Sequence, residues 1–241
     1  MRAQRGGSNG LILVFDLDET ITNTVQPLKM NDNVFNILKT AAGLRYAGVD
    51  AIFLLTNNAD RDYVASIDDV LLNSINSVGL YGGDDGMPLK EYFFDYIMTR
   101  NHPARRNGRK SMTDVMYMCN KIGMEDINMR NFESIMSRTY FFDDQEHDLS
   151  VQLKVSFNSK YNDHSIRITP PFTGRGEIDN TNYEPILNVL ADIPPIPPIN
   201  YRNYANYNPY NNPLSGGKRS RSSSRRSRSK KRRTLTRRKN W

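Results

Sequence analysis

Leu11-Ile12-Leu13-Val14-Phe15-Asp16-Leu17-Asp18-Glu19-Thr20 is the stretch that decides the fold. Its first five residues are all apolar, as in a strand that is buried on both faces of a parallel sheet. Asp16 and Asp18 follow at the carboxyl end of this predicted strand, where open α/β sheets bind their ligands. Two carboxylates this close repel each other unless a cation or a proton lies between them. The stretch therefore predicts a Mg²⁺-dependent phosphoryl-transfer site.

Charge is unevenly distributed along the 241 residues, whose formal net charge is +7. Residues 215–241 contain 13 Lys or Arg and no Asp or Glu, which leaves 20 basic and 26 acidic residues before them, a net of −6. Hydrophobic content is only 38%, so part of the chain is expected not to pack into a core. We predict a flexible N-terminus over 1–8, one folded domain over 9–192, a Pro/Asn/Tyr-rich linker over 193–214 and a disordered basic tail over 215–241.

The single cysteine, Cys119, excludes an internal disulfide and favours a reducing, intracellular location. It lies among apolar residues, which predicts a buried structural thiol rather than a nucleophile. The first ten residues lack the apolar core of a signal peptide, and no apolar stretch reaches the length of about 18 residues that a membrane span requires. The basic tail is compatible with nuclear targeting.

Strand and helix patterns alternate along the predicted domain. Apolar runs predict further strands at 51–55, 139–142 and 165–169. The mixed run 91–98 predicts a strand, with a helix as the alternative. Apolar residues at helical spacing predict helices at 34–44, 60–78, 111–122, 131–137 and 183–191. This alternation is typical of an α/β fold with a mostly parallel sheet and right-handed crossovers.

Three of the predicted strands end on polar clusters, namely Asp16/Asp18, Thr56/Asn57 and Asp143/Asp144. One acidic pair after a strand is weak evidence, because turns and helix caps also favour Asp. Three clusters that converge on one edge of a sheet are a far more specific signal. Their oxygen atoms are ligands of the kind that Mg²⁺ prefers.

On these motifs the chain resembles the haloacid dehalogenase (HAD) superfamily of phosphatases, which use an aspartate nucleophile. The shared features are a DxDxT signature at Asp16–Thr20, a strand-end threonine, a later lysine and a hydrophobic strand followed by two aspartates. The signature is similar to the DLDET form of the small phosphatases that act on the RNA polymerase II carboxy-terminal domain, the NLI-interacting-factor-like branch. The resemblance covers about residues 10–170 and implies a HAD-like Rossmannoid fold without a large cap domain. Asp143-Asp144 replaces the Asp-Asn pair of that branch.

The resemblance also implies catalytic roles. Asp16 would be the nucleophile that forms an aspartyl-phosphate, and Asp18 would act as general acid and then as general base. Thr56 and the backbone N–H of Asn57 would hydrogen-bond a phosphate oxygen.

The cation sites follow from the same resemblance. Mg²⁺ would be held by Asp16, the backbone carbonyl of Asp18 and Asp144, with Asp143 close by. Lys110 would offset the charge of the phosphoryl group, with Lys90 as the alternative.

A basic loop precedes Lys110, with Arg100, His102, Arg105, Arg106 and Arg109. Its residues are open to two interpretations, contact with an anionic substrate or exposure to solvent. Sequence patterns alone do not separate them.

The spacing of the motifs bears on the substrate. Asp16 and Thr56 are 40 residues apart and Thr56 and Lys110 are 54 apart, which leaves little room for a cap domain over the site. An open site favours a phosphorylated macromolecule, with a phosphoprotein as first choice. The alternatives are a polynucleotide phosphatase acting on nucleic-acid ends, and a non-catalytic HAD-derived protein that binds nucleic acid or protein through the basic residues 218–239.

Overall fold

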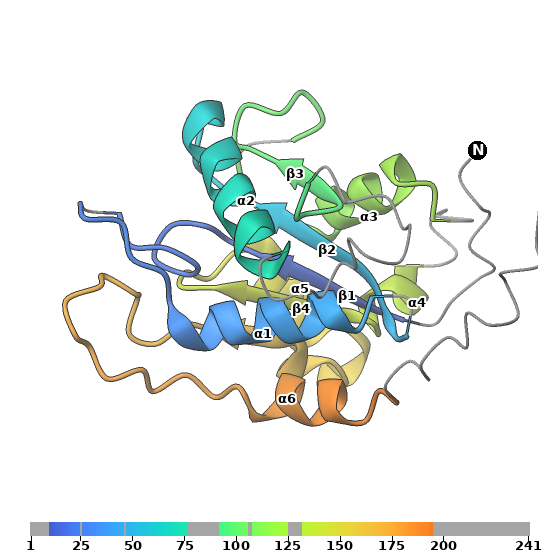
Figure 1. Cartoon of the computed structure of the whole chain (residues 1–241). Helices are drawn as coiled ribbons and strands as arrows, with labels where there is room; N and C mark the ends of the chain where they lie inside the picture. Colours follow the sequence, from blue (N-terminus) through green and yellow to red (C-terminus); the bar gives the residue numbers. More distant parts are fainter. Residues whose placement is uncertain are drawn as a thin grey trace, which may run out of the picture. The chain divides into compact units, whose positions relative to one another are not determined.

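The computed structural model describes residues 10–194 except 25, 46, 77–91, 106–107 and 125–131. One five-stranded, all-parallel sheet runs through this region in the order β3-β2-β1-β4-β5 (Figure 1). Its strands are β1 (Leu11–Phe15), β2 (Val49–Leu55), β3 (Tyr96–Met98), β4 (Thr139–Asp143) and β5 (Ser165–Arg167). The predicted α/β class with a parallel sheet is confirmed.

Helices cover both faces of the sheet (Figure 1). One apolar core contains residues of α1 (Asp32–Gly43), α2 (Arg61–Asn76) and α6 (Glu184–Ala191). The second contains residues of α3 (Met112–Lys121), α4 (Phe132–Met136) and α5 (Asp148–Val155). Central strand β1 contributes to both cores, because its alternate side chains point to opposite faces. This explains its unbroken apolar run.

The differences from the sequence prediction include those at β3, β5 and α5. Strand β3 covers only Tyr96–Met98 of the expected run 91–98, since the Asp68 carboxylate accepts hydrogen bonds from the Phe93 and Phe94 N–H groups at 3.0 and 2.9 Å. Strand β5 ends at Arg167 rather than at 169. Helix α5 was not predicted, because it is short and buries only two apolar side chains, Leu149 and Leu153.

Segment 168–183, which follows β5, returns to the loop 16–31 that follows β1. The Phe172 N–H donates to the Glu19 carbonyl at 2.8 Å, and Lys29 Nζ donates to the Gly174 carbonyl at 2.5 Å. Two parts of the chain that lie about 150 residues apart thus contact each other.

Several expectations fall outside the described residues, namely those for residues 1–9, for Lys90 and Arg106, and for the linker and tail from residue 195 onward. In the described part of the chain, no helix has both the length and the apolar character needed to cross a membrane. Cys119 is fully buried in α3, as predicted, and burial raises its pKa to about 12.

Candidate functional site

The candidate site lies where β1 and β4 end side by side. The two strands are paired in parallel with Phe15 opposite Phe142, whose rings stack with centroids 4.3 Å apart. The Asp16 N–H extends the ladder by donating to the Phe142 carbonyl at 2.9 Å. Asp16 and Asp143 are the next residues of the two strands, so the strand register itself brings them together. In the strand order β3-β2-β1-β4-β5 the chain reverses direction across the sheet between β1 and β4, and α/β sheets bind ligands in the crevice at such a switch point.

Three aspartates form a compact group at this edge. Carboxylate oxygens of Asp16, Asp143 and Asp144 lie within 4.8 Å of one another, and their residues are only 6%, 2% and 4% exposed. Burial, and next the negative charge of Asp16, raise the pKa of Asp143 well above its usual range. The same two causes raise the pKa of Asp144 to about 6. The buried surroundings of the group therefore disfavour the full ionisation of its carboxyl groups.

Lys110 is the main positive charge facing this group. It is fully buried just before α3, with its Nζ atom 2.7 Å from Asp16 Oδ1 and 2.5 Å from Asp143 Oδ2. His147 Nε2 lies 3.5 Å from the same Asp143 oxygen, but burial and the nearby Lys110 charge lower its pKa to about 4, so the ring is neutral at pH 7. One ammonium thus faces three carboxylates.

The donor set fits a hard divalent cation. All three side chains offer carboxylate oxygens, the ligands that Mg²⁺ and similar ions prefer. Asp144 Oδ1 is buried and has no hydrogen-bond partner among the described residues, as expected of an oxygen that is reserved for a metal ion. The side chain of Asp18 is not part of the group, and the metal contact expected from its backbone carbonyl stays a prediction.

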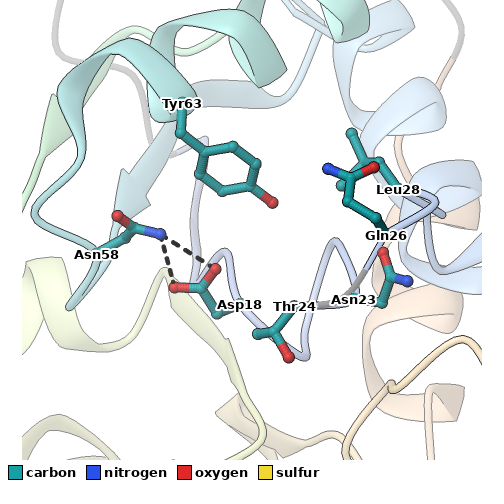
Figure 2. A pocket seen from close by; sticks show the side chains of 7 residues that line it. All are labelled: Asp18, Asn23, Thr24, Gln26, Leu28, Asn58 and Tyr63. Atoms are coloured by element: carbon teal, nitrogen blue, oxygen red, sulfur yellow. Dashed lines mark hydrogen bonds between the residues drawn. The ribbon is translucent and has the colours of Figure 1, made fainter.

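Asp18 is half-buried and is held by an amide that sequence reasoning missed. Asn58 Nδ2 donates to both Asp18 oxygens, at 3.3 and 3.1 Å (Figure 2). The amide orientation is fixed because Asn58 Oδ1 accepts the Asp60 N–H at 2.8 Å. Burial, and next the charge of Asp16, raise the pKa of Asp18, while the bond from Asn58 lowers it. A carboxyl group that retains its proton more readily is suited to general-acid chemistry.

Thr56 follows β2 and is fully buried at the same edge of the sheet. Its Oγ1 accepts the Asn58 N–H at 3.0 Å. Its carbonyl accepts a hydrogen bond from Arg105 at 2.6 Å, and the same guanidinium donates to Asn57 Oδ1 at 2.9 Å and to the Gly108 carbonyl at 3.0 Å. Arg105 therefore fixes the loop that carries Thr56 and Asn57.

The structure shows what three residues of the basic loop before Lys110 contact. Arg105 is only 9% exposed and its hydrogen bonds go to protein acceptors, so neither interpretation of the loop describes it. Arg109 is exposed and pairs with Asp148 at 3.2 Å, and His102 contacts Tyr96 at 3.1 Å. Charge alone gave no signal that would single out Arg105, because its partners are uncharged and two of them, the Thr56 carbonyl and Asn57 Oδ1, are distant in the sequence.

Thr20 joins the two loops of the site. Its Oγ1 accepts the Asp144 N–H at 3.1 Å, which links the loop after β1 to the loop after β4. Glu19, directly before it, has φ +59°, a left-handed conformation that L-residues rarely adopt. The Glu19 N–H donates to the Thr22 carbonyl at 2.7 Å, which helps to stabilise that turn.

Comparison of the chain with family models, with curated proteins and with solved structures gives no match. Fold and site by themselves define the class: an α/β protein with a five-stranded parallel sheet and a buried triple-aspartate group compatible with a metal ion. The particular activity within that class is a matter of proposal.

Proposed function

We propose that this protein is a Mg²⁺-dependent phosphomonoester hydrolase that works through an aspartyl-phosphate on Asp16. The observation that carries the proposal is the buried group of Asp16, Asp143, Asp144 and Lys110 at the carboxyl ends of adjacent parallel strands. Asp18, with its raised pKa, follows Asp16 by two residues. The resemblance to HAD phosphatases in the same residues supports the proposal.

The chain's own residues supply the two half-reactions. An oxygen of Asp16 attacks phosphorus while the bond to the leaving oxygen breaks, and Asp18 gives that oxygen its proton. A water molecule then gives a proton to Asp18 and attacks phosphorus, so that phosphate leaves and Asp16 is restored. Lys110 holds the Asp16 carboxylate and contributes positive charge beside the phosphoryl group.

The three clustered aspartates are the residues that would hold Mg²⁺. When bound, the ion neutralises charge that the phosphoryl group brings to the site. The buried, unpartnered Asp144 Oδ1 supports this assignment.

The short segments that join helices and strands around the site support a bulky substrate, with a phosphoprotein as first choice. The longest of them, between α2 and β3, spans the 19 residues 77–95. That length is too short for an additional domain of ordinary size. Without such a domain over the site, a phosphate on a macromolecular chain can reach it.

The test is phosphate release from 4-nitrophenyl phosphate by the full chain. We expect turnover with Mg²⁺, none with EDTA, and a loss of at least about 10³-fold in Asp16→Asn, because the nucleophile is removed. Asp32→Asn removes an equal charge from the exposed first turn of α1 and should retain activity. Release that is unchanged in Asp16→Asn would exclude the proposed mechanism.

A second readout does not depend on the substrate. Beryllium fluoride mimics a phosphoryl group bound to a carboxylate, and ¹⁹F NMR should detect an adduct in the wild type with Mg²⁺ present. The adduct should be absent in Asp16→Asn and present in Asp32→Asn. An adduct that persists in Asp16→Asn would show that another residue is the acceptor.

A further inference from the structure

A cavity of about 260 Å³ opens beside Asp18 (Figure 2). Its wall consists of Asp18, Asn23, Thr24, Gln26, Leu28, Asn58 and Tyr63. Most of these residues belong to the loop after β1, while Asn58 follows β2 and Tyr63 lies in the first turns of α2. Asp18 is the only proposed catalytic or metal-binding residue in this wall, so its carboxyl group marks the boundary between the cavity and the acidic centre.

The wall is polar but, apart from Asp18, uncharged. Amides and hydroxyls supply its polar groups, and Leu28 with the Tyr63 ring supplies an apolar part. No Lys or Arg is among the lining residues that the structure describes. Lys110 points elsewhere, into its ion pairs with Asp16 and Asp143, and Lys29 Nζ is bonded to the Gly174 carbonyl.

Part of the wall is preorganised. Asn23 Nδ2 donates to the Pro27 carbonyl at 3.0 Å and its Oδ1 accepts the Lys29 N–H at 2.7 Å. The Tyr63 hydroxyl hydrogen-bonds Thr22 Oγ1 at 3.1 Å, and Asn58 is fixed between Asp60 and Asp18. Gln26 is exposed, and no hydrogen bond of its side chain is found among the described residues. Its amide is thus the group that can adapt to a ligand.

We propose that this cavity binds the alcohol portion of the phosphomonoester and selects an uncharged, partly apolar leaving group. The inference rests on the proposed function, in which Asp18 protonates the leaving oxygen and therefore faces the alcohol side of the substrate. The volume lies just below the range of about 300–1,000 Å³ typical of small-molecule pockets, so the cavity takes one group of several atoms. Leu28 and Tyr63 contact its apolar face, and Gln26 hydrogen-bonds its polar edge.

Electrostatics argues against an anionic leaving group. Asp18, the proposed general acid, is protonated when the substrate binds and therefore offers an anion no charge to pair with. Because no Lys or Arg is among the described lining residues, a carboxylate that enters this partly enclosed cavity loses hydration without gaining an ion pair.

The experiment compares two substrates of closely similar shape that differ in formal charge, 4-carbamoylphenyl phosphate and 4-carboxyphenyl phosphate. With the full chain and Mg²⁺, we expect kcat/KM to be at least about tenfold higher for the carbamoyl compound, because removing an unpaired charge from water, even in part, is costly. In Gln26→Lys a cation enters the cavity wall, and the ratio should fall below about threefold. Leu187→Lys adds the same charge at a half-exposed residue of α6 that is not part of the cavity wall. This variant should keep the wild-type ratio.

Each outcome bears on a different claim. Equal kcat/KM for both compounds, or a Gln26→Lys ratio like that of the wild type in a variant with normal thermal melting, would overturn the inference and leave the hydrolase intact. An Asp16 beryllium fluoride adduct without turnover of either compound would also overturn the inference alone. Absence of both adduct and turnover would remove the proposed function, and the inference with it.

Discussion

Replacement of Lys110 should have a large effect on the stability of the protein. Its ammonium is fully buried between Asp16 and Asp143, so replacement leaves buried carboxylates without their cation. We expect Lys110→Met to lower the free energy of unfolding by about 3–5 kcal/mol, the usual cost of breaking a buried ion pair from one side. Urea denaturation in EDTA at pH 7.5 measures it. Lys121→Met, at the exposed end of α3, is the matched control and should change little.

Protons and metal ions compete for the same carboxylates. In the metal-free protein the pKa of Asp144 is raised to about 6 and that of Asp143 is raised as well. An acid whose pKa is higher in the folded than in the unfolded state binds more protons when folded, so these two carboxyl groups should contribute a loss of stability to the metal-free protein as the pH rises from about 4 to about 7. The lowered pKa of His147 acts in the opposite direction and offsets part of this loss.

Mg²⁺ requires the ionised carboxylates, so its apparent affinity should rise over the same pH range and each binding event should release protons. Calorimetric titration in buffers of different ionisation enthalpy measures both quantities. A Mg²⁺ affinity that is independent of pH between 5 and 7 would contradict this assignment of the site.

At the scale of elements, the loops after β1 and β4 are joined by one side-chain contact, from the Asp144 N–H to Thr20 Oγ1. Thr20→Val keeps the shape but removes the acceptor, leaving a buried N–H unpaired beside an aspartate of the proposed metal site. Loss of such a supporting contact typically costs about 10–100-fold in metal affinity, and we expect weaker Mg²⁺ binding in this range. Thr113→Val, on the exposed first turn of α3, should bind Mg²⁺ normally.

The elements that carry the site were predictable because they are the most apolar. Strands β1, β2 and β4 are buried on both faces, so each appears in the sequence as a continuous apolar run, and the polar residues that follow mark one edge of the sheet. Asp16, Asp143 and Asp144 were therefore placed together correctly.

The rest depends on contacts that no local pattern encodes. Asn58 and Arg105 act through partners that the fold brings near, such as the Asp18 carboxylate and the Thr56 carbonyl. Helix α5 has too few buried apolar residues to produce a helical period. Strand β3 is short because acidic side chains take N–H groups that would otherwise extend it.

At the scale of the whole molecule, an acidic stretch with a net charge of −6 precedes a tail with 13 basic residues and no acidic ones. Such a tail should bind nucleic acid nonspecifically, with dissociation constants of about 10⁻⁴–10⁻⁶ M that weaken steeply with salt. Deletion of 215–241 should abolish this binding, as fluorescence anisotropy with a labelled oligonucleotide can measure.

The same deletion separates the two enzymatic candidates. If phosphoproteins are the substrates, kcat/KM for a phosphopeptide should not change when 215–241 is removed. If nucleic-acid ends are the substrates, KM for a terminally phosphorylated oligonucleotide should rise and lose its dependence on salt. A result of the second kind would reverse our first choice of substrate.

The contact between segment 168–183 and the loop after β1 has a consequence for the order of events during synthesis. A nascent chain that has emerged only as far as β5 already contains all the aspartates of the acidic centre, but not Phe172 or Gly174. The loop after β1, which forms most of the cavity wall, then lacks its hydrogen bonds with these two residues. The proposed reactive centre is thus translated first, whereas the proposed substrate cavity is completed only when the last part of the domain leaves the ribosome.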